Sequence, residues 1–63
     1  MPARLQKAID KNLADLTDRV KKLNGMVKKG DYHPSTASSL MTLVGGNAEI
    51  LSAVFDKLAD DAD

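Results

Sequence analysis

The residues with the most chemical potential lie together in the middle of the chain, in the stretch KKGDYHPSTASS at positions 28–39. Two lysines precede an expected bend, and hydroxyl side chains follow it at an expected helix N-terminus, where free backbone N–H groups attract anions. An aromatic ring there can stack on a base. The stretch therefore allows a site for a phosphate-bearing ligand, either RNA or a small nucleotide, formed by Lys28, Lys29, Tyr32, His33, Ser35, Thr36 and Ser38.

The same residues also fit a purely structural role, which we favour. Lysines at a helix C-terminus complement the helix dipole, a glycine ends the helix in a left-handed conformation, and serines cap the next helix. No glycine-rich phosphate fingerprint such as GxxxxGKS or GxGxxG occurs in the sequence. On this interpretation, Tyr32 and His33 cover the end of the core.

Catalytic and metal-binding chemistry find no support in the sequence. The chain has no cysteine, and its only histidine, His33, has no nucleophile or orienting acid that spacing places beside it. Structural zinc sites use four ligands drawn mainly from cysteine and histidine. The acidic end DKLADDAD lacks the glycine-pinned turn of a calcium loop. We expect no enzymatic activity, no cofactor and no metal.

Length and charge limit the class of protein. The chain has 63 residues with nine basic and nine acidic side chains, so its net charge gives no general attraction to nucleic acid or an anionic membrane. A domain of about this size buries only about 60% of its unfolded surface and is marginally stable alone. The longest uncharged stretch, residues 32–48, is too short to span a bilayer. We expect a cytoplasmic protein without membrane contact.

A helical repeat organises the first half of the chain. Apolar residues recur there at spacings of three and four, close to a heptad pattern; they are Leu5, Ile9, Leu13, Leu16, Val20, Leu23 and Val27. The pattern predicts a helix over about residues 2–29, with Gly25 in its interior and Gly30 as its left-handed cap. A bend over residues 30–34 follows.

The second half predicts a helix over about residues 35–60, with an acidic, frayed tail over 60–63. Its apolar face comprises Leu40, Val44, Ala48, Leu51, Phe55 and Leu58, and it is widened by Leu43, Ile50 and Val54. A hairpin of two helices cannot by itself bury faces this wide.

Gly45-Gly46-Asn47 allows two architectures. It could be a loop, in which case Asn47 caps a third helix and the chain is a three-helix monomer. We favour a continuous helix, because the apolar stripe keeps its phase across the glycines. In that case a small-residue surface lets another helix approach; it consists of Thr42, Gly45, Gly46, Ser52 and Ala53.

The distribution of charge bears on assembly. Residues 19–33 carry five cations and one aspartate, a net charge of +4, whereas residues 49–63 carry five acids and one lysine, a net charge of −4. We therefore predict an all-α fold in one domain, 1–63: an antiparallel hairpin of two long helices that assembles as a homodimeric, antiparallel four-helix bundle. The predicted core and interface residues are Leu13, Leu16, Val20, Leu23, Val27, Leu40, Leu43, Val44, Gly45, Gly46, Ile50, Leu51, Val54, Phe55 and Leu58.

Three classes of function are compatible with these features. The first is a small non-enzymatic regulator that modulates, inhibits or scaffolds a larger protein through its helix faces. The second is the RNA or nucleotide binder described above, and the third is a subunit whose second helix completes the bundle of another protein. We favour the first. Small dimeric bundle regulators, including accessory proteins of phages and plasmids, offer a fold-level analogy only.

Overall fold

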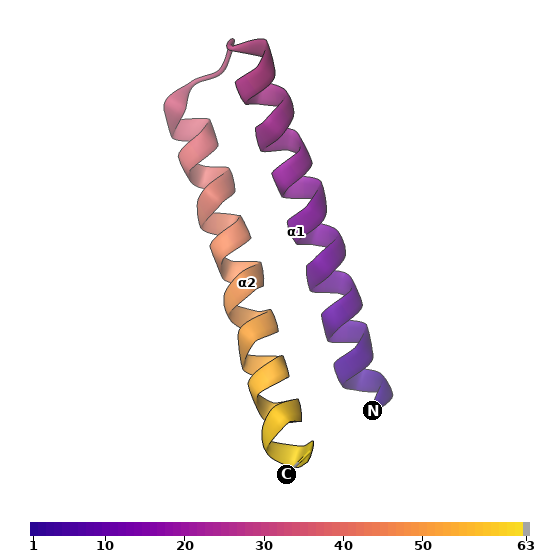
Figure 1. Cartoon of the computed structure of the whole chain (residues 1–63). Coiled ribbons are helices and arrows are strands. Elements are labelled where there is room, and N and C mark those ends of the chain that lie inside the picture. The colour runs from indigo at the N-terminus through magenta and orange to yellow at the C-terminus, as the bar shows by residue number, and fades with distance from the viewer. Residues whose placement is uncertain (63) are drawn as a thin grey trace.

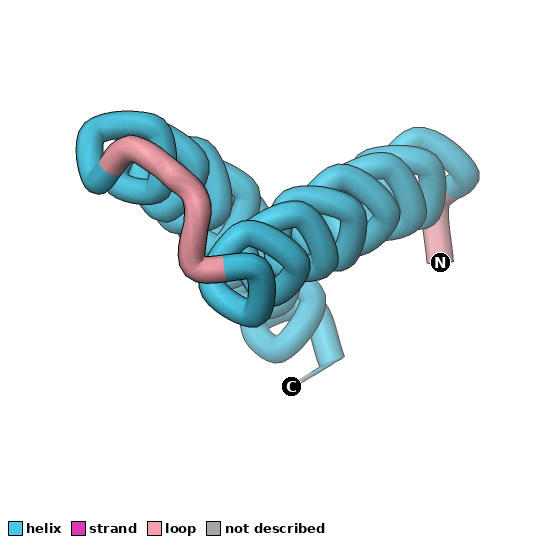
Figure 2. The backbone as a smooth tube through the Cα atoms, turned by 90° about the horizontal axis from the view of Figure 1, so that it is seen from above, coloured by secondary structure: helices cyan, strands magenta, loops and turns pink. Residues whose placement is uncertain are grey.

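The computed structural model describes residues 1–62 and contains two helices, α1 (Ala3–Lys29) and α2 (Pro34–Ala62), joined by a short bend. The helices run in opposite directions, so both ends of the chain lie at the end of the molecule opposite the bend (Figure 1). Seen from above, the two helix axes are inclined to each other rather than strictly parallel (Figure 2). The predicted all-α hairpin is confirmed.

Gly30 ends α1 in the way its sequence predicts. Its backbone is left-handed, with φ at 72°, and its N–H donates to the carbonyl of Met26 at 3.0 Å. Lys28 and Lys29 occupy the last turn, where positive charge complements the helix dipole. Gly25 lies inside the helix, as predicted, because the helical pattern continues through it without a break.

The start of α2 is capped by His33 rather than by the serines that follow it. The Nδ1 atom of His33 accepts a hydrogen bond from the Ser35 N–H at 3.1 Å and lies 2.7 Å from Ser35 Oγ. The His33 carbonyl accepts from the N–H groups of Thr36 and Ala37. The serines expected as caps act otherwise: Ser39 Oγ, for example, donates back to the Ser35 carbonyl one turn earlier.

The second helix is continuous through Gly45 and Gly46, so the three-helix alternative is wrong. Both glycines have helical backbone, since Gly30 is the one described glycine with positive φ. The helix continues to Ala62, slightly beyond the predicted end near residue 60. Fraying of the acidic tail stays a prediction, and Asp63 lies outside the described residues.

The two helices contact each other along a narrow surface that we call the seam. On α1 the seam consists of Leu5, Ile9, Asn12, Leu16, Arg19, Leu23 and Met26. On α2 it consists of Ala37, Leu40, Val44, Asn47, Leu51, Val54 and Leu58. Both sets alternate spacings of three and four residues, and every member is buried or partly buried. The best-buried apolar side chains are Ile9 and Leu51.

The seam of α1 is rotated relative to the predicted stripe. Leu13, Val20 and Val27, which the sequence pattern places on the same face as Leu16, are 45%, 45% and 58% exposed. Each follows directly after a seam residue, and two of those seam residues are polar. The physical reason is that Asn12 and Arg19 take seam positions, which turns the next apolar residue outward. A role for these residues in an intermolecular interface stays a prediction.

In length and composition alone, α2 meets the criteria for a membrane-spanning helix over Pro34–Asp61, with a mean hydropathy of 1.2 in its most apolar window. The segment Pro34–Asp61 extends beyond the uncharged residues 32–48 and includes Glu49. Core helices of soluble proteins have the same composition. Only 11% of the window is buried in the hairpin, so most of the apolar surface of α2 is uncovered.

Gly25, inside α1, and Gly30, the C-cap of α1, give a matched pair of stability predictions. Gly30→Ala forces a side chain into a left-handed conformation and should lower the free energy of unfolding by about 1 kcal/mol. Gly25→Ala, where an added Cβ would meet no atom within 4 Å, should raise it by about 1 kcal/mol. Thermal unfolding followed by circular dichroism measures both, and shifts in the same direction would contradict this account.

Candidate functional site

A cluster of three polar side chains lies at the centre of the seam. Asn47 is only 6% exposed, and its Oδ1 accepts a hydrogen bond from Nη1 of Arg19. Its Nδ2 donates to Oδ1 of Asn12 at 2.9 Å, and Nδ2 of Asn12 donates to the Ala8 carbonyl at 2.8 Å. The bonds therefore form one chain from Arg19 through Asn47 and Asn12 to the α1 backbone.

Side-chain length makes this arrangement possible. Asn12 and Arg19 are seven residues apart on one face of α1, so the seam places them two turns apart, on either side of Asn47. The short asparagine approaches from one side and the long guanidinium side chain from the other. Among the described residues, every buried side-chain nitrogen and oxygen atom has a partner. None of the buried polar atoms of the cluster is therefore left without a hydrogen-bond partner.

The periodicity of the sequence did not predict this cluster. Asn47 is expected as a helix cap only in the loop alternative, and the spacing of Asp15 and Arg19 predicts an i,i+4 ion pair on the surface of α1. In the structure, Asp15 pairs instead with Lys11 at 3.3 Å, and Arg19 turns to Asn47. Asp18 and Lys22 have the same i,i+4 spacing, and they form an ion pair at 3.6 Å. The signal that could have found the cluster is an asparagine in phase with the apolar stripe on each helix.

On one side of the seam the hairpin presents a surface that we call the uncharged face. By helical position it consists of Leu13, Thr17, Val20, Asn24 and Val27 on α1 and Met41, Gly45, Ala48, Ser52 and Phe55 on α2. All ten are exposed, and none carries a charge. Its large apolar side chains remain about half accessible to solvent, for example Met41 at 55% and Phe55 at 48%.

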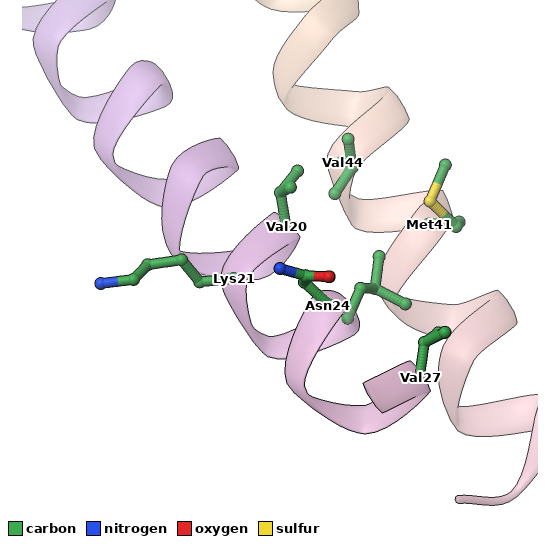
Figure 3. A pocket seen from close by; sticks show the side chains of 7 residues that line it. Val20, Lys21, Asn24, Val27, Met41 and Val44 are labelled. Carbon is green, nitrogen blue, oxygen red and sulfur yellow. The ribbon is translucent and has the colours of Figure 1, made fainter. Parts of the chain in front are cut away.

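A groove of about 610 Å³ lies in the uncharged face near the bend. It is lined by Val20, Lys21, Leu23, Asn24, Val27, Met41 and Val44. Figure 3 shows side chains from α1 and α2 converging on this groove, whereas the Lys21 side chain extends away from α2. The groove is therefore apolar at its base, with its one cation at the rim.

The other side of the seam, which we call the charged flank, has a different character. A groove of about 530 Å³ near the bend is lined by Lys22, Gly25, Met26, Lys29, Asp31, Thr36 and Leu40. Leu43 and Ile50 follow Thr36 at intervals of seven residues, so they continue the same side of α2. They are 48% and 49% exposed. Apolar and basic side chains are therefore interspersed along this flank.

The predicted phosphate-site residues are divided between the groove of the charged flank and the rest of the bend. Lys29 and Thr36 line the groove of the charged flank, but Lys28, Tyr32, His33, Ser35 and Ser38 do not. The N–H groups of the first turn of α2, on Ser35, Thr36 and Ala37, all donate to His33. Pro34 has no N–H. The donors that an anion would need at this helix end are already in use.

Within residues 1–62, no group of three or more histidine, cysteine or acidic side chains is placed to hold a metal ion. The chain matches no protein-family model, and comparisons with curated proteins and with solved structures find no match either. The interpretation of the two sides of the hairpin therefore depends on their geometry and charge.

The polar cluster gives a stability prediction. Asn47→Leu removes the partner that Asn12 Oδ1 and Arg19 Nη1 have across the partly buried seam, and it should lower the free energy of unfolding by about 1–3 kcal/mol. Replacing all three residues with leucine should restore or exceed the original stability, because no unpaired polar group remains. Urea denaturation measures both.

The matched control is Asn24→Leu, the same substitution at an exposed asparagine, which should not destabilise the chain. If Asn47→Leu were as stable as the native chain, the cluster would not constrain the seam.

Proposed function

We propose that this chain is a small, non-enzymatic interaction protein that works as a homodimeric, antiparallel four-helix bundle and modulates, inhibits or scaffolds a larger protein. The observation that supports it best is the apolar surface that the hairpin leaves uncovered on both sides of its seam. A chain of this length gains much of its stability by covering such surface.

The two sides of the hairpin suit different partners. The uncharged face, whose ten residues carry no charge, resembles the core of an obligate assembly and suits a second copy of the chain. The charged flank combines half-exposed Leu43 and Ile50 with Lys22 and Lys29, and interfaces with separate proteins mix apolar and charged contacts in this way. It suits a larger protein that presents apolar and acidic side chains.

The homodimer is tested by adding a negative charge either to the uncharged face or to the outer side of α1. Val20→Glu places a carboxylate in the uncharged face, and we expect it to convert the dimer to a monomer, because the charge would have to be buried without a partner. Ala14→Glu adds the same charge on the outer, exposed side of α1 and should leave the dimer intact. Light scattering during gel filtration measures the mass of each.

A native chain that is monomeric at all accessible concentrations would contradict the homodimer. So would a chain that stays in solution only with detergent and partitions into lipid vesicles, since that result would show that lipid covers α2.

The larger partner is tested with a photo-crosslinking amino acid at Ile50 on the charged flank, in the cells that make the chain. We expect an adduct heavier than twice the chain mass of 6.8 kDa. The same group at Ala14 is the control and should give none. If Ile50 yields only the dimer adduct or none, the charged flank has no protein partner.

The RNA or nucleotide alternative has less support, because His33 uses the first-turn N–H groups of α2. It predicts binding that weakens steeply with salt and is lost in the double variant Lys28→Glu, Lys29→Glu. We expect no such salt-sensitive binding in a fluorescence titration with single-stranded RNA or ATP. Binding that disappears in the double variant would favour the alternative.

A further inference from the structure

We infer that two copies of the chain pack through the uncharged face about a two-fold axis that passes beside Ala48, so that Phe55 of each copy fills the groove near the bend of the other. The inference rests on the proposed homodimer and specifies its geometry. It follows from the order of residues along the uncharged face, from the grooves and from the charges.

The α2 part of the uncharged face reads nearly the same in both directions from its centre. Its residues are Met41, Gly45, Ala48, Ser52 and Phe55, at alternating spacings of four and three. Large side chains occupy the two ends, and small ones occupy the middle. Such a row is complementary to an antiparallel copy of itself, because small residues meet at the crossing and let the helices approach closely.

The polar cluster shows which level of α1 the axis crosses. Asn47 is hydrogen-bonded to both Asn12 and Arg19, so it lies level with the α1 residues between them. An axis perpendicular to the helices that passes beside Ala48 therefore crosses α1 between Leu13 and Thr17. In a two-fold dimer with bends at opposite ends, α1 then faces α1 and α2 faces α2.

The groove near the bend and the exposed phenylalanine are complementary under this symmetry. Phe55 lies seven residues beyond Ala48, and Met41 lies seven residues before it. The axis therefore places Phe55 of one copy over Met41 of the other, which lines the groove together with Val27 and Val44. At each end of the interface, the Phe55 ring of one copy therefore contacts the apolar groove of the other.

Charge selects the same direction. The bend half of the hairpin carries the net +4 of residues 19–33, and the open end carries the net −4 of residues 49–63, whereas residues 1–18 and 34–48 are each neutral overall. With bends at opposite ends, each basic half lies beside an acidic half of the other copy. With bends at the same end, like charges would adjoin at both ends.

The presence of glycine at position 45, in the α2 part of the uncharged face, is consistent with this packing. A Cβ added at Gly45 would meet no atom of the hairpin within 4 Å, so contact with α1 does not require a glycine there. Gly45 has helical backbone, where glycine is unfavourable compared with alanine. Close approach of a second helix would account for it.

Disulfide trapping tests the geometry, and the chain offers a clean background because it has no cysteine. Ala48→Cys should form covalent dimers under mild oxidation, because position 48 of one copy meets position 48 of the other at the axis. Ser52→Cys alone should not, but mixed with Gly45→Cys it should give mixed covalent dimers. Ala14→Cys, on the outer side of α1, is the control and should stay monomeric on a denaturing gel.

The contribution of Phe55 is tested by measuring how its replacement changes the affinity between the two copies. Phe55→Ala should raise the Kd of the dimer about tenfold or more, as measured by sedimentation equilibrium. Leu43→Ala is a matched control, since Leu43 and Phe55 are both 48% exposed but Leu43 lies on the charged flank. It should leave the Kd unchanged. If both variants changed the Kd equally, Phe55 would not bind in the groove of the other copy.

The outcomes separate this inference from the proposed homodimer. If the native chain is a dimer but Ala48→Cys gives no covalent product, the dimer uses another surface and the inference is wrong. If Ser52→Cys alone forms covalent dimers, position 52 of one copy meets position 52 of the other, so the axis does not pass beside Ala48 and the inference is again wrong. A monomeric native chain would overturn both.

Discussion

The hydrogen-bonded cluster of Asn12, Arg19 and Asn47 is the constraint on which the rest of the hairpin depends. Apolar contacts along a heptad seam tolerate a shift of one helix against the other, because one leucine resembles the next. A buried amide does not tolerate it, since a shift would leave polar atoms without partners. A buried asparagine specifies register in coiled coils in the same way. Here it determines which level of α2 lies beside which level of α1.

This polar cluster also accounts for the exposed apolar surface. Because Asn12 and Arg19 occupy seam positions, Leu13 and Val20 are turned to the side of the hairpin. The narrow seam then leaves α2, which is apolar around much of its girth, largely uncovered. The same residues that align the two helices therefore create the uncharged face, for which we propose a second copy as the partner.

The bend shows how chemically varied residues can be used for structure. From the sequence alone, the bend resembles a ligand site, because it combines lysines, a glycine, a histidine, a proline and serines. In the fold, Gly30 ends α1, the imidazole and carbonyl of His33 cap α2, and Ser39 bonds to the backbone of its own helix. Backbone groups at helix ends need partners, and nearby side chains supply them first. Lys22, Lys29 and Thr36 instead belong to the groove of the charged flank.

The sequence by itself determined the two helices, their cap at Gly30 and the continuity of α2 through Gly45 and Gly46, because periodicity and capping are local properties of the chain. It also determined the opposed charges of the two ends. Only the tertiary structure decided which of two adjacent stripes on α1 faces α2. Leu13 and Asn12 fit a helical face equally well by spacing, and the outcome depended on whether Asn12 and Arg19 could find Asn47 across the seam. That pairing joins residues far apart in the chain, and local periodicity carries no information about it.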